Sequence, residues 1–413
     1  LGLAAVVGAI GCLTATVSGS ADLGEAWAAW RAGDVADAER LAAAHAESDE
    51  GRHLLFLCDF VQGDYVRALA RHAEIDPAYP RHAELDPPVV EAYLHLARYA
   101  DARAFAQRNG RLSEPARLQV SLRAGKPLTA SLEGHTVVTF ADHPLAPFFP
   151  AFEAEIEGHE HVVHLDTGGT FLIMGPDRAA AFGIELTPAG EGSHGSRRVP
   201  MSLGVAKRLR LGGAVLENVP VATLASLTGS QDFVIFGTNV LEQFLSTLDY
   251  PNARLILSKR GDPEAERAHR ELLDEGDAVE IPFYMWGDHY MFARGGVGVR
   301  RDLNWFIDSG LVSLHPDGQG GMRQAAFIAA GADYLEWGVD PGLVKDVFEL
   351  PLPLSLGPLE QTGLLVLARD EGSPARDLGG IRIDGLLSHA FLKRYAWTLD
   401  FDRRVYRFHQ EAD

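Results

Sequence analysis

The sequence Leu165-Asp166-Thr167-Gly168-Gly169-Thr170 follows a strand-like run, His161-Val162-Val163-His164, and a second tripeptide of the same kind, Asp308-Ser309-Gly310, follows Asn304-Trp305-Phe306-Ile307. A single Asp-(Ser/Thr)-Gly is ordinary turn sequence, because each of these residue types favours turns. Two copies, each placed directly after a strand, indicate a repeated half-site that brings two carboxylates together.

Each copy also has a matching closing segment further along the chain. These segments are Phe244-Leu245-Ser246-Thr247-Leu248-Asp249-Tyr250 and Tyr395-Ala396-Trp397-Thr398-Leu399-Asp400-Phe401. Both end in Thr-Leu-Asp-aromatic and lead into a last strand, at 254–257 and 404–408. Internal similarity over this length is stronger evidence than any single motif and predicts a duplicated unit.

Two Asp side chains about 3 Å apart cannot both ionise, so they share one proton. The neutral carboxyl can donate to a substrate carbonyl, and the ionised one can take a proton from a water that attacks the amide carbon. We therefore predict Asp166 and Asp308 as catalytic residues, with neither a metal nor another cofactor. Four residues are expected to support the loops: Thr167, Gly168, Ser309 and Gly310. The hydroxyls of Thr167 and Ser309 can bond to the backbone of the opposite half, and the glycines let the backbone come close to the carboxylates because they have no Cβ.

From about Ser113 to Asp413 this pattern resembles the aspartic proteases, and its details are most similar to the retropepsin-like branch. The first copy is the closer match, with a strand at 151–156, a helix-like stretch at 176–182 and the closing run Val234-Ile235-Phe236-Gly237. The resemblance implies that the Gly-rich segment 190–196 is a flap over the substrate. Its candidate substrate-binding residues are Gly192, Ser193 and Gly195. Retroviral members need two chains for one site, whereas this chain carries both halves, as pepsin-like members do.

The second copy departs from the family pattern. Leu311 follows Asp308-Ser309-Gly310, where a small residue is usual, and aligning the closing segments puts Ser388 opposite Gly237. A three-residue shift would put Gly385 there instead. The expected second flap, 316–338, contains Gly318, Gly320 and Gly321 and also a helix-like stretch at 323–330. These changes leave Asp308 in place and bear on the rate of turnover.

Composition limits the other functions. The 413 residues suggest two or three domains, and 46% apolar residues allow sizeable cores. A net charge of −20 argues against nucleic-acid binding and disfavours acidic peptides as substrates. With only two cysteines, Cys12 and Cys58, a disulfide framework is not expected.

The first residues, 1–21, are predicted to be a signal or leader segment. Leu1 to Gly11 are all apolar or glycine, too few to span a bilayer. Ala9-Ile10-Gly11-Cys12 loosely resembles a lipoprotein cleavage box, with lipidation at Cys12; cleavage after Ser18-Gly19-Ser20-Ala21 and a frayed helix are the alternatives. We expect export or association with the cell envelope, with a membrane anchor only through this lipid or leader; a cytoplasmic location is the alternative.

Residues 22–112 are rich in Ala, with apolar residues three and four apart, which predicts helices. Three segments look alike, Trp30 to Val35, Phe60 to Tyr65 and Leu96 to Ala102, at offsets of about 30 and 34 residues. This spacing is near the tetratricopeptide period, and such helix pairs can bind a protein partner on a concave face. A plain helical prodomain or packing cap is the alternative.

We thus predict a mainly β protein with two pseudo-symmetric barrel-like lobes, at 113–261 and 277–413, joined by a charged linker at 262–276. The predicted function is aspartic-type endopeptidase activity on a peptide or protein substrate. The alternative, from another class, is a catalytically impaired peptide-binding scaffold that uses the helical repeats and the cleft. The closely spaced His159, His161 and His164 invite a metal reading, but on a strand His164 points away from the other two.

Overall fold

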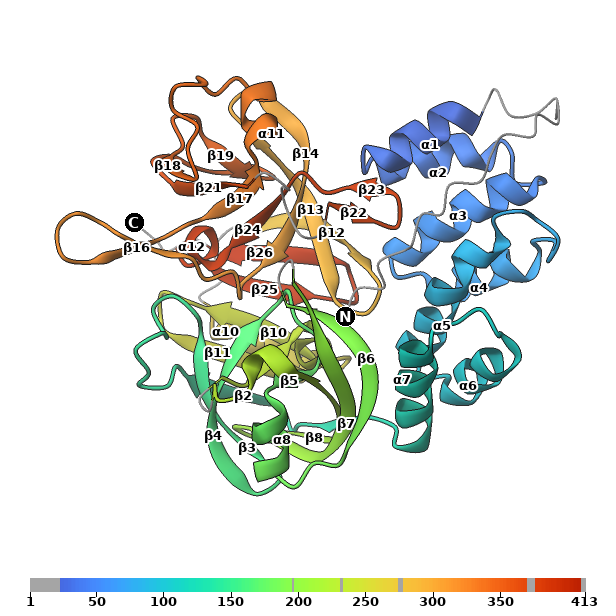
Figure 1. Ribbon diagram of the computed structural model, residues 1–413, viewed down its shortest axis with the longest axis horizontal. Helices are drawn as coiled ribbons and strands as arrows, with labels where there is room; N and C mark the ends of the chain where they lie inside the picture. The colour runs from blue at the N-terminus through green and yellow to red at the C-terminus, as the bar shows by residue number, and fades with distance from the viewer. Residues whose placement is uncertain (1–22, 195–196, 231–232, 274–277, 370–375, 410–413) are drawn as a thin grey trace.

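The computed structural model describes residues 23–194, 197–230, 233–273, 278–369 and 376–409. A helical region lies beside a body made largely of β-strands (Figure 1). The leader, with Cys12, and the flap residue Gly195 lie outside the described residues. None of the described helices is both long and apolar enough to cross a membrane.

The helical region consists of three helical hairpins followed by a single helix. The helices are α1 (Leu23–Arg31), α2 (Val35–Ala43), α3 (Asp49–Val61), α4 (Tyr65–Ala73), the short η1 (His82–Leu85), α5 (Asp86–His95), α6 (Tyr99–Arg108) and α7 (Glu114–Gly125). The three similar segments fall at the hairpin turns. Gly33 and Gly63 take the left-handed conformation there, at φ of 72° and 84°, and the next residue, Asp34 or Asp64, caps the following helix.

The helical region is packed into the body and shares a core with it. Trp30 is buried and donates to the Gly379 carbonyl over 2.9 Å, while Phe60 meets Trp286 edge to face. His95 stacks on Tyr65 and lies 3.3 Å from the Glu242 carboxylate. This apolar and ionic contact makes the helices part of one folded unit.

The first half of the β body holds the first Asp. Its elements are β1 (Thr129–Ser131), β2 (His135–Thr139), β3 (Ala151–Ile156), β4 (His159–Asp166), β5 (Leu172–Met174), α8 (Pro176–Ala181), β6 (Leu186–His194), β7 (Arg197–Leu211), β8 (Ala214–Leu224), η2 (Ala225–Leu227), β9 (Ile235–Gly237), α9 (Thr238–Leu241), β10 (Phe244–Asp249) and β11 (Arg254–Lys259).

The second half holds the second Asp. Its elements are β12 (Val279–Trp286), β13 (Tyr290–Val297), β14 (Arg300–Asp308), β15 (Leu314–Pro316), β16 (Met322–Gln324), β17 (Phe327–Ala330), α11 (Gly331–Glu336), β18 (Val347–Glu349), β19 (Leu354–Leu356), β20 (Leu359–Gln361), β21 (Leu365–Arg369), β22 (Asp377–Leu378), β23 (Ile381–Arg382), β24 (Gly385–Ser388), α12 (His389–Leu392), β25 (Ala396–Asp400) and β26 (Val405–His409).

The two Asp-bearing strands have the same neighbours in the two halves. β4 runs parallel to β9, β9 is antiparallel to β5, and β5 is parallel to β8. In the second half β14 is parallel to β24, β24 is antiparallel to β17, and β17 is parallel to β21. A run of six strands, β12-β26-β25-β10-β11-β2, joins the halves. At its centre Thr247 of one closing segment pairs with Thr398 of the other.

The segment expected as a second flap is a different structure. Asp317 to Gly321 form the turn of the β15–β16 hairpin, in which Gly318 and Gly320 have positive φ. The stretch 323–330, expected to be helical, contains the strands β16 and β17 instead, and the helix α11 starts at Gly331. All four residues of β17 are buried between β21 and β24, so tertiary pairing overrides the helical preference of an Ala-rich sequence.

The segment 262–276 carries helix α10 (Pro263–Glu271), which packs back on the body. Its buried His269 bonds to the hydroxyls of Thr247 and Ser258 over 2.6 and 2.7 Å. Burial lowers the pKa of His269 to about 3, so the ring is neutral at ordinary pH. The helix therefore supports the sheet that joins the two halves.

Candidate active site

The two Asp residues stand at the ends of equivalent strands. Asp166 ends β4 beside Gly237 of β9, and Asp308 ends β14 beside Ser388 of β24. In both pairs the strands are parallel, so each Asp lies where the carboxyl ends of two neighbouring strands meet at the edge of the sheet. Of the two alignments considered for the second half, the structure has the one with Ser388, while Gly385 pairs with Trp305.

The hydroxyl residues after each Asp lock the two loops together. The Thr167 N–H donates to Ser309 Oγ and the Ser309 N–H donates to Thr167 Oγ1, each over 3.0 Å. The Thr167 hydroxyl then donates to the Ile307 carbonyl over 2.9 Å, and the Ser309 hydroxyl to the Leu165 carbonyl over 3.2 Å. Both side chains are fully buried, so these four bonds fix one loop against the other without competition from water.

The glycines allow the carboxyl groups to approach. A methyl group on Gly168 would lie 2.7 Å from the Asp308 carboxyl carbon, and one on Gly310 would lie 2.2 Å from that of Asp166. Each glycine N–H also donates to the Asp two residues before it, over 2.7 Å to Asp166 and 3.0 Å to Asp308. Any side chain at these two positions would push the carboxyl groups apart.

The two carboxyl groups are close enough for the charge of Asp166 to shift the pKa of Asp308. Burial and the charge of Asp166 raise the pKa of Asp308 well above its usual range. Burial also raises the pKa of Asp166, but its hydrogen bond with Asp308, the Gly168 N–H and the charge of His289 act in the opposite direction. The pKa of Asp308 is thus raised further than that of Asp166. Both side chains remain partly open to solvent.

A polar cluster beside the first loop was not predicted from the sequence. The Thr170 hydroxyl lies 3.0 Å from Asn239 Oδ1 and 3.1 Å from Asp288 Oδ2, and the Asn239 amide donates to the Asp288 carbonyl over 2.5 Å. His289 Nδ1 is 2.5 Å from the other Asp288 oxygen. Asp288 and His289 occupy the turn between β12 and β13, and the turn sequence alone does not indicate that it reaches the opposite half.

Of the candidate flap residues, Gly192 and Ser193 lie on the β6–β7 hairpin. Gly192 pairs with Val199, and the Ser193 backbone pairs with Arg198, near the end of the hairpin. Among the described contacts, none joins these residues to the carboxyl pair. Their part in substrate binding therefore stays a prediction.

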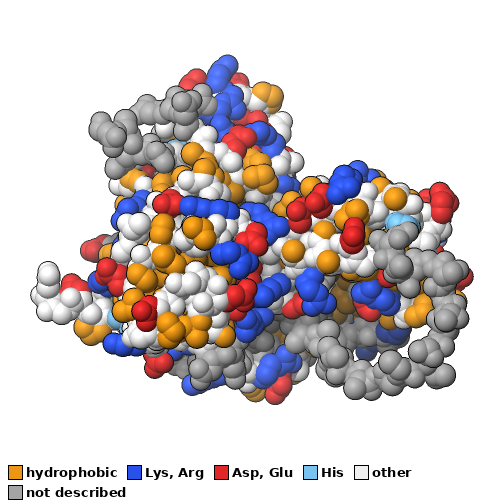
Figure 2. Space-filling view, turned by 90° about the horizontal axis from the view of Figure 1, so that it is seen from above, with side chains coloured by type: hydrophobic (Ala, Val, Ile, Leu, Met, Phe, Trp, Pro, Cys, Tyr) orange, Lys and Arg blue, Asp and Glu red, His pale blue; other side chains and the backbone are white. Residues whose placement is uncertain are grey.

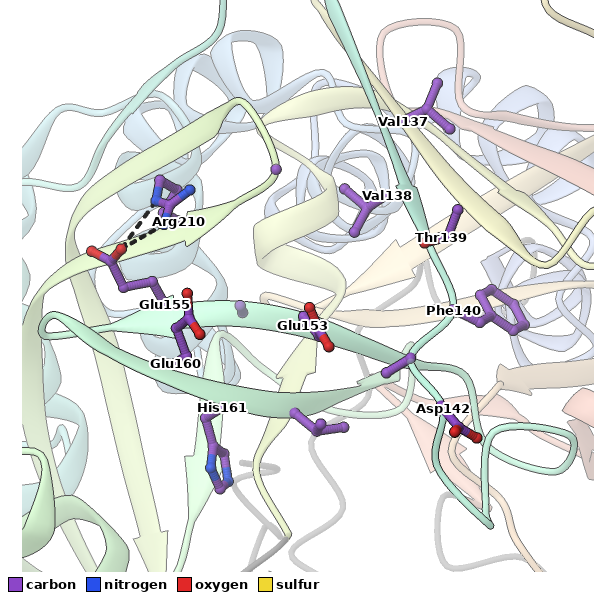
Figure 3. Close-up of a pocket in the computed structure, with 14 residues that line it drawn as sticks. Val137, Val138, Thr139, Phe140, Asp142, Glu153, Glu155, Glu160, His161 and Arg210 are labelled. Atoms are coloured by element: carbon purple, nitrogen blue, oxygen red, sulfur yellow. Dashed lines mark hydrogen bonds and ion pairs between the residues drawn. The ribbon is translucent and has the colours of Figure 1, made fainter.

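A cavity of about 650 Å³ lies away from the carboxyl pair, where β2 and β3 diverge (Figure 3). Glu153, Glu155 and Glu160 line one side of it, and Val138 lies on the other. Arg210 forms an ion pair with Glu155 over 2.6 Å. Because exposed ion pairs contribute little, this one has only a local role.

Acidic and basic side chains are interspersed over the face of the molecule seen in Figure 2, across both the body and the helical region. The net charge of −20 is therefore not gathered into one patch on that face.

Comparisons with known proteins give one family model and solved structures of low identity. The family model described as aspartyl protease matches residues 152–240, which contain Asp166 and its supporting strands. Two solved structures are similar at low identity. A retropepsin-like aspartic protease from Rickettsia conorii shares 13% identity over 32% of this chain and 94% of its own, with a TM-score of 0.24. An aspartic proteinase from Irpex lacteus shares 10% over 67% of this chain and 97% of its own, with a TM-score of 0.42. No curated protein matches the chain.

Proposed function

We propose that this protein is an aspartic endopeptidase in which Asp166 and Asp308 activate a water for attack on a peptide bond. The observation that carries the proposal is the placement of each Asp carboxyl group against the glycine of the other Asp-(Thr/Ser)-Gly loop, with the two loops bonded to each other reciprocally. The match of residues 152–240 to an aspartyl protease family supports the same chemistry.

In this mechanism the two carboxyl groups have different tasks. Asp308, whose pKa is raised further, holds the proton and donates it to the oxygen of the scissile carbonyl. Asp166 is ionised and takes a proton from the water held between the two groups. During the attack Asp308 loses its proton and Asp166 gains one, so the net charge of the pair is unchanged. No covalent intermediate forms. Since the pair titrates together, the pH profile of kcat reports two apparent pKa values that belong to the pair.

We further propose that the two halves are copies of one unit related by a pseudo-twofold axis. The equivalent strand orders around β4 and β14 support this, as does the pairing of Thr247 with Thr398, whose hydroxyl oxygens lie 2.5 Å apart. An axis through this pair and through the Thr167–Ser309 contact would relate each Asp to the other. Superposition of the two halves in an experimental structure, with matching strands overlaid, is the test; different strand paths would contradict the duplication.

The test of the activity uses a reduced and alkylated basic protein, such as lysozyme, as an unfolded substrate, since an acidic enzyme disfavours acidic peptides. The wild-type chain should release peptides, and a peptide carrying a statine-type hydroxyl should inhibit it by replacing the attacking water. Asp166→Asn and Asp308→Asn should each lose cleavage, because one carboxylate cannot serve as both base and acid. Asp302→Asn, a change on the exposed part of β14, is the matched control.

Retained cleavage in either active-site variant would overturn the mechanism. A wild-type chain that binds unfolded peptides but never cleaves them, at acid and neutral pH, would instead favour the scaffold function considered above. The three helical hairpins support a tetratricopeptide-like arrangement, through which a protein partner could bind. Export or attachment to the cell envelope, with Cys12 as the lipid site, stays a prediction that fractionation of cells expressing the full-length protein would test.

A further inference from the structure

The loop that follows Asp166 has an inner and an outer side. On the inner side the backbone is held by β9 and α9: the Thr238 N–H donates to the Gly169 carbonyl over 3.1 Å, and the Gly237 N–H to that of Phe171 over 2.9 Å. On the outer side the loop presents the Thr170 hydroxyl and the Phe171 ring. Both of these groups meet partners from other parts of the chain.

The Thr170 hydroxyl meets Asn239 of α9 in the first half and Asp288 in the second half of the body. It has one proton and two acceptors, Asn239 Oδ1 and Asp288 Oδ2, so it can donate to only one of them at a time. Burial alone would raise the pKa of Asp288, but the charge and hydrogen bond of His289 hold it well below its usual range. Asp288 is thus an ionised acceptor, and bonds to charged groups are stronger than neutral ones.

The Phe171 ring is held by the helical region. Arg123 of α7 is 7% exposed, and its guanidinium carbon lies 5.1 Å from the centre of that ring. A cation over a ring face is attracted more strongly when the contact is desolvated. Leu118 and Leu122 of the same helix pack on the sheet formed by β7 and β8, which fixes α7 on the first half (Figure 1).

The positive charge of the buried Arg123 guanidinium favours a lower pKa at two carboxyl groups, those of Asp288 and of Glu91 on α5. Burial, with the repulsion of Asp288, raises the pKa of Glu91 to about 7 in spite of Arg123. The charge of Arg123 therefore favours the ionised form of both carboxyl groups.

The equivalent loop of the second half is held differently. After Asp308-Ser309-Gly310 the chain forms the β15–β16 hairpin, whose Gln324 amide donates to the carbonyls of Leu311 and Phe148, each over 3.0 Å. Phe148 belongs to the first half. Each loop is thus supported from the opposite half, and the loop of Asp166 also meets Arg123 of the helical region.

From these contacts we propose that Arg123 and Asp288 are positioning residues for the Asp166 loop, so that helix α7 is a working part of the catalytic unit. Neither touches the reacting atoms. They act through Phe171 and Thr170, whose placement fixes the direction of the Asp166 carboxyl group. This inference rests on the proposed function in one respect only, the assignment of Asp166 as the base.

The experiment combines hydrogen exchange with kinetics on the full-length protein. Arg123→Met keeps the apolar volume but removes the charge and the planar group, and Asp288→Ala removes the acceptor. In both variants the peptide spanning residues 165–173 should exchange faster than in the wild type. The kcat of each variant is measured on a quenched fluorescent peptide whose sequence is taken from a mapped cleavage site. It should fall about 10- to 100-fold while KM stays within about threefold, because a misplacement of the catalytic carboxyl group by about 1 Å costs that much in rate.

Two further variants separate positioning from general damage. Arg123→Lys keeps the charge without the stacked plane, so it should recover part of kcat. Arg98→Ala removes another guanidinium stacked on an aromatic ring, 4.9 Å from the centre of Tyr93, and should behave as wild type. Unchanged exchange at 165–173, or faster exchange spread equally over α7 and the β6–β7 hairpin, would overturn the proposal. If the wild type cleaves nothing, the proposed function fails, while the exchange result still decides whether the loop is held by these residues.

Discussion

Thr167 and Ser309 exchange equivalent bonds: the N–H of each donates to the side-chain oxygen of the other, and both distances are 3.0 Å. The two residues come from opposite halves of the chain, 142 positions apart. Each of these bonds needs both Asp loops in place. The two loops can therefore reach this conformation only together. The carboxyl pair is therefore a product of the assembly of both halves.

Removal of one hydroxyl should affect both loops. In Ser309→Ala the buried Thr167 N–H loses its acceptor, which costs about 1–3 kcal/mol of the free energy of unfolding. We expect kcat to fall about 10- to 100-fold as the carboxyl groups lose alignment. Urea denaturation and peptide hydrolysis measure the two effects. Ser309→Thr keeps the hydroxyl and is the matched control; equal behaviour of the Ala and Thr variants would contradict the role of the bond.

The glycines beside the pair should not accept even one methyl group. Gly310→Ala would place a carbon 2.2 Å from the Asp166 carboxyl carbon, so the carboxyl group has to move. We expect hydrolysis to fall by at least about 100-fold with the protein still folded, as judged by circular dichroism. Gly24→Ala, on a helix with open space around it, is the control and should be silent. Activity in Gly310→Ala near that of wild type would show that the pair tolerates separation.

Repeated motifs carried the prediction of the β body, because local signals in both copies agree with each other. The strand 151–156 and the helix starting at Pro176 are where the sequence places them. A short helix, Thr238–Leu241, follows Gly237. Periodic apolar residues likewise predicted the helices of residues 22–112, whereas α7 lies in the segment expected to begin the first lobe. In each of these segments, local preference and tertiary packing favour the same structure.

Other parts depend on contacts that the sequence does not display. The stretch 323–330 is Ala-rich, yet β21 and β24 draw its second half into a buried strand. Asp288 and His289 acquire their surroundings only when the β12–β13 turn meets Asn239 of the other half. Arg123 looks like any helical arginine until α7 lies on the first lobe. Long-range partners decide these three cases, and no local pattern encodes them.

Ser388 illustrates the same limit. By its place opposite Gly237 it resembles a strained replacement for glycine, so Ser388→Gly would be expected to be neutral or to improve turnover. In the structure its hydroxyl donates to the Ala325 carbonyl over 2.7 Å and accepts from the Ala390 N–H over 3.0 Å. We now expect Ser388→Gly to lower the free energy of unfolding by about 1–2 kcal/mol without a gain in kcat. Ser388→Ala should lose a similar amount. A variant as stable as wild type and faster would restore the expectation of strain.

The raised pKa of Asp308 predicts how its substitution changes stability with pH. A carboxyl whose pKa is higher in the folded than in the unfolded protein binds its proton more tightly when folded, so its contribution is present at low pH. The pKa of Asp308 is 3.8 in the unfolded protein and higher in the folded one. As the pH rises between these two values, the folded protein must either keep Asp308 protonated or bury a second negative charge. Both cost free energy, so the stability falls. Asp308→Asn has no such titration. The free energy of unfolding of Asp308→Asn, relative to wild type, should therefore increase from about pH 4 to about pH 8, as measured by urea denaturation.

Asp302→Asn serves as the control, because Arg300 lowers the pKa of Asp302. Neutralising Asp302 should therefore make the variant less stable relative to wild type at the higher pH. A difference between Asp308→Asn and wild type that stays constant or shrinks as the pH rises would mean that Asp308 does not hold the shared proton.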